Sequence, residues 1–198
     1  RRTRVPNLDI VGWHDHCNGD LAMHRTITAE GATAVARKQS RVIIGPWSHN
    51  GRGRSGFGNI RFGPHARVNL IAEQVRWFDY WLKGRNNGVD RDPRVRLFVM
   101  GDNRWRDEHE WPLSRAVRKV LYLDSDRPAN TAAGAGRLVD RRPGDQRADR
   151  YVYDPRHPVP SLHGTAMYSI PADQRPHAAR EDILVYQTEP LTERIEVT

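Results

Sequence analysis

The first half of the chain alternates short apolar runs with amphipathic segments. Two runs, Asn7–Trp13 (NLDIVGW) and Ser40–Gly45 (SRVIIG), are short and rich in Val and Ile, which predicts buried strands. The residues between them, from about Asp20 to Thr28, predict a helix. The apolar face of this helix is expected to carry Leu21, Met23 and Ile27.

A second and stronger helix is predicted from His65 to Gly84. Apolar residues recur along one face of this segment, at Ile71, Val75, Phe78 and Leu82. Asp79 and Lys83 are four residues apart, which places their opposite charges side by side on a helix, and Gly84 suits the position after the helix end. Two strand–loop–helix units in succession favour an α/β layer with a parallel sheet.

The pattern changes at residues 84–93 (GRNNGVDRDP), a turn-rich segment that indicates a connector. Beyond it, helical periodicity gives way to five short strand-like runs: RVRLFVMG, RKVLYLDS, DRYVYDP, DILVYQT and TERIEVT. Stretches rich in Pro and Gly separate these runs, and such an alternation predicts a β-sandwich or jelly roll. The fold class expected from the sequence is therefore an α/β part followed by an all-β part.

Composition narrows the range of partners. The chain of 198 residues has a net charge of +8, but its 32 basic residues are spread along the sequence and interleaved with acidic ones. Nucleic-acid-binding proteins usually concentrate positive charge on one face or tail, so we expect no nucleic-acid partner. No apolar span is long enough to cross a membrane, and the mean hydropathy is −0.77. The single cysteine, Cys17, excludes an internal disulfide and is compatible with the cytoplasm.

Two motifs contain ligand-binding residue types in an unsuitable context. Gly51, Gly53 and Gly56 form a G-x-G-x-x-G sequence, but residues 46–50 separate it from the predicted strand and no helix follows at once, as a dinucleotide site requires. The stretch His14–Cys17 (HDHC) lies near His24 and His49 in the sequence, yet no pair has the spacing of a zinc site. We therefore interpret the glycines as a loop and predict no metal site.

Asp15 and His49 form a third candidate site. Each residue lies just past the carboxyl end of a predicted parallel strand, where functional groups gather in open α/β sheets. A carboxylate in that place can accept a hydrogen bond from imidazole Nδ1 and orient the ring as a general base. The alternative is structural: Asp15 would cap the following helix, and His49 would rest on Trp47.

The chain contains no nucleophile motif of the α/β-hydrolase type. That fold runs nucleophile, acid and histidine in chain order, with the serine in G-x-S-x-G. The closest match, residues 53–57 (GRSGF), fails at its last position. Asp15 and His49 occur in the expected order, so a nucleophilic serine is expected upstream of Arg1.

Five segments together resemble the cocaine-esterase / X-Pro dipeptidyl-peptidase family of serine hydrolases. They are VGWHDH, IIGPWSHNG, RWFDYWLKGRNNGV, PRVRLFVMGDNRWRDEHEWP and DRYVYDPRHPVPSLHG. The resemblance covers essentially the whole chain, with the motifs in the family's order. It implies that residues 1–88 are the C-terminal part of an α/β-hydrolase domain. Residues 89–198 would then belong to a jelly-roll domain of the galactose-binding-like type, which is expected to be truncated.

The same resemblance assigns roles to residues. The family's acid motif corresponds to residues 12–15 (GWHD), which implies that Asp15 is the acid, although His14 stands where an aromatic is usual. The GPWSH motif implies that His49 is the base. It implies no metal and no cofactor, and a substrate that is a small ester, an amide or an X-Pro peptide. Because the serine, the oxyanion donor and the helical cap fall outside the chain, the chain alone is expected to be inactive. A homo-oligomer is compatible with the resemblance.

A non-catalytic binding module is the competing hypothesis. The β-rich part would bind a carbohydrate or another subunit, with the α/β part as scaffold. Four residues would supply an aromatic and charged patch: Arg104, Trp105, Asp107 and Trp111. Tryptophan is also common in β cores and between domains, and we favour that structural interpretation.

Overall fold

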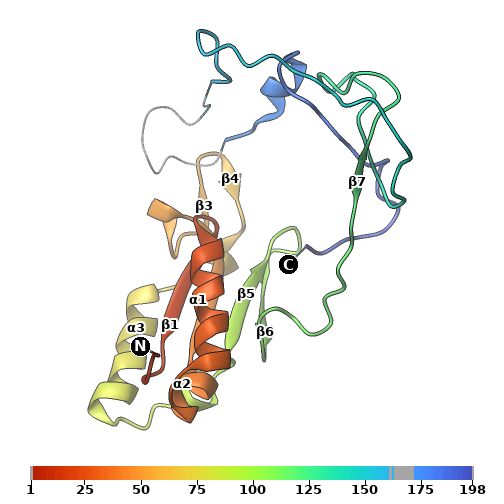
Figure 1. Cartoon of the computed structure of the whole chain (residues 1–198). Coiled ribbons are helices and arrows are strands. Elements are labelled where there is room, and N and C mark those ends of the chain that lie inside the picture. The colour runs from red at the N-terminus through yellow and green to blue at the C-terminus, as the bar shows by residue number, and fades with distance from the viewer. Residues whose placement is uncertain (1, 161, 163–171, 198) are drawn as a thin grey trace. The chain divides into compact units, whose positions relative to one another are not determined.

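The computed structural model describes residues 2–160, 162 and 172–197. They form two units, the first ending at Ala116 and the second beginning at Val117. A four-stranded sheet in the order β1-β2-β5-β6 forms the centre of the first unit (Figure 1). Its strands are β1 (Leu8–His14), β2 (Arg41–Ser48), β5 (Val95–Val99) and β6 (Arg104–Glu108). The pair β1/β2 is parallel, as predicted. Strand β5 also pairs parallel to β2, although its run RVRLFVMG was expected in the all-β part, and β6 runs antiparallel to β5.

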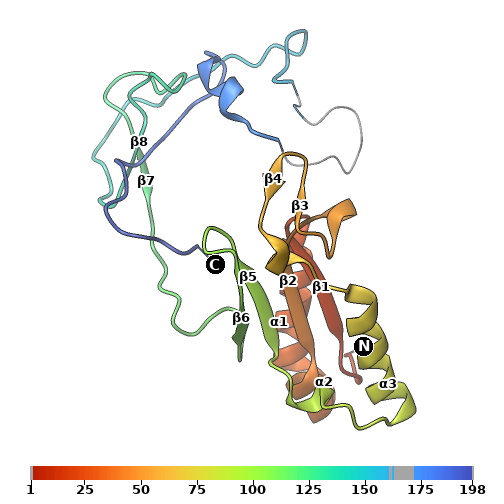
Figure 2. The same ribbon diagram turned by 180° about the vertical axis from the view of Figure 1, so that it is seen from behind.

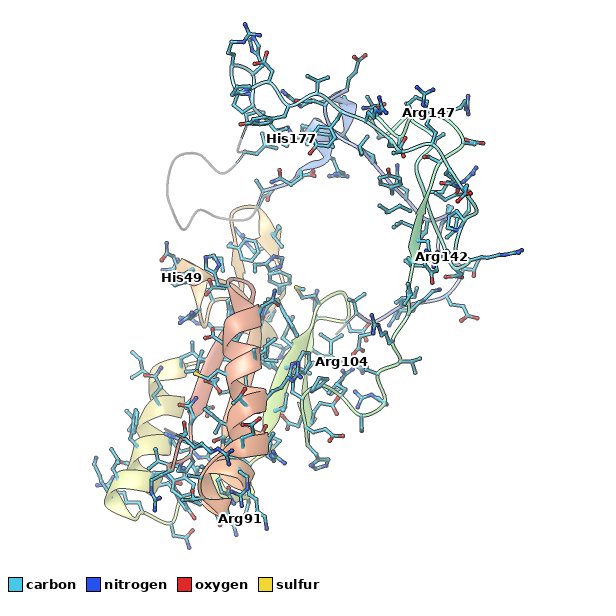
Figure 3. All side chains as sticks on the ribbon, in the orientation of Figure 1. His49, Arg91, Arg104, Arg142, Arg147 and His177 are labelled. Atoms are coloured by element: carbon cyan, nitrogen blue, oxygen red, sulfur yellow. The ribbon has the colours of Figure 1, made fainter. Side chains whose placement is uncertain are left out.

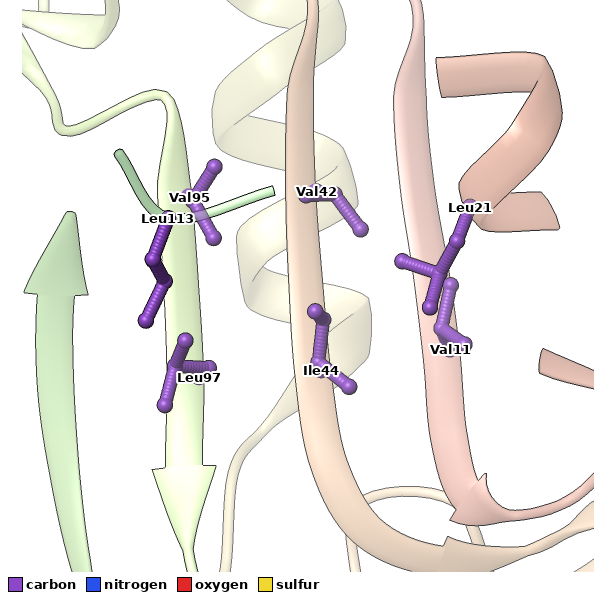
Figure 4. Close-up of a cluster of buried hydrophobic side chains, with 7 residues drawn as sticks. All are labelled: Val11, Leu21, Val42, Ile44, Val95, Leu97 and Leu113. Carbon is purple, nitrogen blue, oxygen red and sulfur yellow. The ribbon is translucent and has the colours of Figure 1, made fainter. Parts of the chain in front are cut away.

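Strand β2 is central and every one of its eight residues is buried. This explains its continuous apolar sequence, because a parallel strand that is covered on both faces needs apolar residues at successive positions. One face contributes to a cluster beneath α1, drawn in Figure 4: Val11, Leu21, Val42, Ile44, Val95, Leu97 and Leu113. A second cluster joins Phe57, Phe62, Ala66 and Phe98. These two clusters fix the sheet whose strand ends carry the candidate site.

Helix α1 (Cys17–Glu30) confirms the first predicted helix but starts earlier and ends later. Leu21 and Ile27 are buried as expected, but Met23 is exposed, and His24 is buried in its place. The reason is helical periodicity, since positions 21, 24 and 27 share one face whereas position 23 lies off it. A short helix that was not predicted, α2 (Ala34–Gln39), is capped by Thr33, whose side chain accepts a hydrogen bond from Ala36 N.

Helix α3 (Leu70–Lys83) confirms the second predicted helix but starts at Leu70 instead of His65, which lies in a separate 3₁₀ turn. Asn69 caps its start by accepting from Ala72 N, and Gly84 ends it at a positive φ of 66°, a conformation that glycine adopts without steric cost. Lys83 and Asp79 form the expected ion pair at 2.6 Å. Figures 1 and 2 show α1 and α3 on opposite faces of the sheet.

The apolar stripe of α3 is exposed in this structure, although such a stripe normally faces a core. Its four members are all at least half-exposed: Ile71, Val75, Phe78 and Leu82. Trp77 is instead the buried residue of the helix. In addition, Arg76 donates to Asp92, which also pairs with the buried Arg41 at the start of β2. Helix α3 is therefore held by one aromatic ring and an ion-pair network.

The second unit contains little regular structure among its described residues. Strands β7 (Tyr122–Asp124) and β8 (Arg137–Val139) pair antiparallel, and isolated bridges join Asn130 to Leu184 and Arg137 to Gln187. The predictions of strands at DRYVYDP, DILVYQT and TERIEVT are wrong, since those described residues form no strand longer than a bridge. Tyr151, Val152 and Tyr153 are exposed, so no packed face selects an extended ladder there.

The remaining elements are short. They are β3 (Gly56–Phe57), β4 (Ile60–Arg61) and the 3₁₀ turns η1 (His49–Gly51), η2 (Pro64–Ala66), η3 (Val89–Arg91) and η4 (Arg175–Ala179). In the part of the chain that the structure describes, no helix is both long and apolar enough to cross a membrane. The predicted domain boundary between residues 88 and 89 stays a prediction, and β5 and β6, which follow it, are hydrogen-bonded into the sheet of the first unit.

Candidate active site

The candidate site lies where β1 and β2 end side by side. The last residue of β1, His14, is paired with the last residue of β2, Ser48. The next residues along the two strands are Asp15 and His49, so the parallel register places them at the same edge of the sheet. Figure 3 shows His49 at this edge, at the opposite end of the unit from Arg91.

Asp15 and His49 are joined by a hydrogen bond. Nδ1 of His49 lies 3.1 Å from both carboxylate oxygens of Asp15. The Asp15 side chain is only 5% exposed, whereas that of His49 is 40% exposed. The carboxylate is thus buried behind the imidazole, and the ring is partly exposed.

Two further donors hold the Asp15 carboxylate. The backbone N–H of His16 donates to Oδ1 at 2.8 Å, and the guanidinium of Arg52 donates to Oδ2 at 2.8 Å. Burial alone would raise the pKa of Asp15, but the hydrogen bonds from Arg52, His16 and His49 outweigh it, so the pKa lies below its usual range. The carboxylate is therefore ionised at neutral pH.

Trp47 sets the path of the chain into His49. Its ring is buried, and its Nε1 donates to the carbonyl of Arg54 at 2.9 Å. A Cβ added to Gly45 would overlap the Trp47 ring, and one added to Gly12 would overlap the Trp47 carbonyl. Glycine is therefore required at both positions, because the backbone and the indole approach too closely for any side chain.

This geometry matches the acid–base half of a serine-hydrolase triad. A carboxylate on Nδ1 fixes the ring and stabilises the imidazolium that forms when Nε2 takes a proton. Proton transfer alone does not break an acyl bond, so a nucleophile is also needed for that reaction. The arrangement has the geometry that a general base and its orienting acid require.

Comparisons with known proteins show the family of this chain. Residues 87–198 match the X-Pro dipeptidyl-peptidase C-terminal non-catalytic domain, which is more than half of the chain. Cocaine esterase from Rhodococcus sp. (strain MB1 Bresler) is 40% identical over 98% of this chain and 34% of its own length. The chain belongs to the cocaine-esterase / X-Pro dipeptidyl-peptidase family.

A solved structure supports the fold of this family member. An aminopeptidase from a marine sediment Thaumarchaeota archaeon superimposes with a TM-score of 0.72 at 26% identity, over 96% of this chain and 31% of that one. The mixed α/β fold with several sheets is therefore shown. The chain spans about a third of the length of these relatives. The candidate site precedes residue 87 and so lies outside the domain described as non-catalytic.

The other histidines of the HDHC region do not join the candidate site as metal ligands. His14 packs edge-on against Phe57, with ring centroids 4.9 Å apart, and burial lowers its pKa. His24 lies in the core against Asp9. Among residues 2–160, 162 and 172–197, no group of three or more His, Cys, Asp or Glu could hold a metal ion.

Arg52 is the residue that sequence reasoning missed. It follows His49 by three positions, and η1 between them is a single 3₁₀ turn. In a 3₁₀ helix the side chains at positions i and i+3 eclipse each other, so both can reach one carboxylate. The sequence signal for Arg52 would have been its spacing: it follows His49 by three residues, directly after a predicted strand.

The tryptophans of the proposed binding patch pack inside the first unit. Trp105 packs edge-on against Phe98 and at a tilt against Trp47, and its Nε1 donates to the carbonyl of His65 at 2.7 Å. Trp111 contacts Trp13, with ring centroids 5.8 Å apart. These contacts favour the structural interpretation of both residues.

Proposed function

We propose that this chain is the C-terminal portion of a serine hydrolase that cleaves ester or amide bonds. Asp15 and His49 would be the acid and base of its triad, and the serine would lie in residues upstream of this chain. The observation that carries the proposal is the hydrogen bond from His49 Nδ1 to the buried Asp15 carboxylate at the strand ends. The kinship with cocaine esterase supports an acyl-transfer reaction.

The proposed reaction has two halves. The serine Oγ attacks the substrate carbonyl while His49 Nε2 takes the hydroxyl proton, and His49 then returns that proton to the departing alcohol or amine. Water next attacks the acyl-enzyme in the same way and releases the acid and the free serine. Asp15 stays ionised throughout and stabilises the imidazolium, which suits its lowered pKa.

Two observations favour a larger enzyme as the context for this chain. The sequence contains no G-x-S-x-G motif. The exposed stripe of α3 is the kind of surface that an adjoining part of an α/β domain covers. We further propose that residues 89–198 belong to a jelly-roll domain; the family match over residues 87–198 supports a C-terminal domain in this part of the chain. The substrate is an ester, an amide or an X-Pro peptide.

The test uses the longer reading frame that contains this chain. We expect a G-x-S-x-G serine upstream, hydrolysis of p-nitrophenyl acetate by the longer protein, and labelling of that serine by a fluorophosphonate. The 198-residue chain alone should do neither. The proposal fails if no such serine precedes residue 1, or if the 198-residue chain hydrolyses the ester as fast as the longer protein.

A further inference from the structure

The Asp15 carboxylate is shared between two side chains of one turn. Oδ2 accepts from Arg52 at 2.8 Å and also lies 3.1 Å from His49 Nδ1. The Asp15 side chain is 5% exposed and that of Arg52 is 38% exposed. The carboxylate of this ion pair is therefore buried, and the guanidinium is partly in contact with solvent. The pair is therefore less screened than a fully exposed salt bridge.

The local backbone makes this arrangement specific to position 52. The turn η1 starts at His49, and Arg52 follows it with extended φ and ψ of −55° and 134°. Gly53 then takes a positive φ of 80°, and its carbonyl accepts from Val68 N at 3.0 Å, which ties the loop to the chain ahead of α3. Arg54 lies in the same loop but its side chain makes no ion pair with any residue that the structure describes.

The charge of Arg52 acts on both members of the pair. A guanidinium stays protonated at every pH at which an esterase works, so its charge is constant. It attracts the Asp15 carboxylate, and it opposes the development of a second positive charge on the imidazole bonded to that carboxylate.

We propose that Arg52 is a positioning residue of the Asp15–His49 pair: its guanidinium fixes the orientation of the carboxylate that holds the imidazole, and its constant positive charge is coupled to the imidazole through that carboxylate. For its catalytic consequence the proposal rests on the function proposed above. Its physical part, the coupling between Arg52 and His49, is independent of that function.

Other titratable groups lie at the same edge of the sheet. His14 ends β1 and is packed on Phe57, and His16 and Cys17 lie at the start of α1. Across the loop, the Arg61 guanidinium of β4 donates to the carbonyls of residues 58 and 60. Of these cationic and titratable side chains, Arg52 is the one that bonds to the carboxylate holding His49.

The first experiment measures the coupling in the 198-residue chain itself. The Cε1–H signal of His49 is followed by NMR from pH 4 to 9 in the parent, in Arg52→Gln and in the matched control Arg54→Gln. We expect the His49 titration midpoint to rise by roughly half a pH unit in Arg52→Gln, because a nearby positive charge has been removed. Arg54→Gln should move it far less, and Arg52→Lys should restore most of the parent midpoint. Equal midpoints in Arg52→Gln and Arg54→Gln would overturn the proposal.

The second experiment asks whether the coupling reaches catalysis. In the longer protein, the acidic limb of the kcat/KM profile should move to higher pH in Arg52→Gln, by a similar amount, while the plateau falls by less than about tenfold. A loss of plateau activity with an unmoved limb would mean that Arg52 is only structural. If the NMR midpoint moves but activity does not depend on His49, the proposed function fails and the coupling stands.

Discussion

The pairs Asp15–His49 and Asp9–His24 both join a carboxylate of the β1 region to an imidazole Nδ1, at 3.1 and 3.2 Å. Their surroundings differ. The His49 side chain is 40% exposed beyond the end of β2, whereas the His24 side chain is 2% exposed and lies on the inner face of α1. The second oxygen of Asp15 binds the charged Arg52, and that of Asp9 accepts from the neutral amide of Asn7.

The difference shows that an acid–histidine hydrogen bond does not by itself identify an active site. Asp9–His24 satisfies two buried polar groups and connects α1 to β1, which is a structural task. Asp15–His49 presents one edge of its ring to solvent at the carboxyl edge of the sheet, where a substrate can reach it. Exposure and position separate the two pairs, and mutations should separate them as well.

The largest expected effect comes from His49→Ala in the longer protein. We expect kcat for p-nitrophenyl acetate to fall by about 10⁴-fold, because the general base is lost. The thermal unfolding midpoint should hardly change, since the ring is partly exposed. His65→Ala, at another exposed histidine, is the control and should keep its activity. Full activity in His49→Ala would exclude the proposed role of His49.

Asp15→Asn should produce nearly as large an effect with almost no change in shape. An amide in this place favours the wrong imidazole tautomer and removes the charge that stabilises the imidazolium, so kcat should fall by about 10³- to 10⁴-fold. The measurement is steady-state ester hydrolysis, with Asp90→Asn as an exposed control. Activity within tenfold of the parent would contradict an orienting role for Asp15.

His24→Ala should show the opposite profile. The free energy of unfolding should fall by about 3 kcal/mol, because the Asp9 carboxylate would be left buried without its partner. Urea denaturation of the 198-residue chain measures the loss. The double variant Asp9→Ala/His24→Ala should lose less than the sum of the two single variants. Additive losses would show that the two side chains do not stabilise each other.

The smallest expected effect is the response of stability to acid. The pKa of Asp15 is lowered by folding, so its contribution to stability is complete above about pH 4, the usual carboxyl value, and is lost as pH falls through the lower folded value. Asp15→Asn should therefore have a flatter stability curve below pH 4 in urea titrations. Asp90→Asn should keep the parent slope. Parallel curves for Asp15→Asn and its parent would contradict a lowered Asp15 pKa.

Periodicity predicted the first unit well and the second unit poorly. The strands around residues 8–14 and 41–48 and the helices α1 and α3 follow from apolar runs and helical spacing, and the structure confirms them. In the second unit, the short run Tyr151, Val152 and Tyr153 suggested a strand, but its residues are exposed. A short run of residues with high β propensity forms a strand only when it packs against another strand or a core.

For the candidate site, the sequence predicted only the residues that directly follow the two strands. Asp15 and His49 could be expected to meet because parallel strands finish at one edge. Arg52 depends on a single 3₁₀ turn, and the His24–Asp9 pair depends on which side of α1 faces β1. The conformation of a single turn and the buried face of a helix depend on packing against other parts of the fold. The order of residues in the sequence does not reveal that packing.

The contact between Gly45 and the Trp47 indole has a consequence for mutational tolerance. Gly45 and Gly12 have no side chain that could take part in a reaction. A side chain at either position would nevertheless displace Trp47. His49 lies two residues after Trp47 and would move with it. In a saturation library selected for activity, both positions should therefore be as depleted of substitutions as His49 itself. The exposed Arg54, in the same loop, should accept most replacements. Tolerance at this edge of the sheet thus follows steric room more closely than chemical participation.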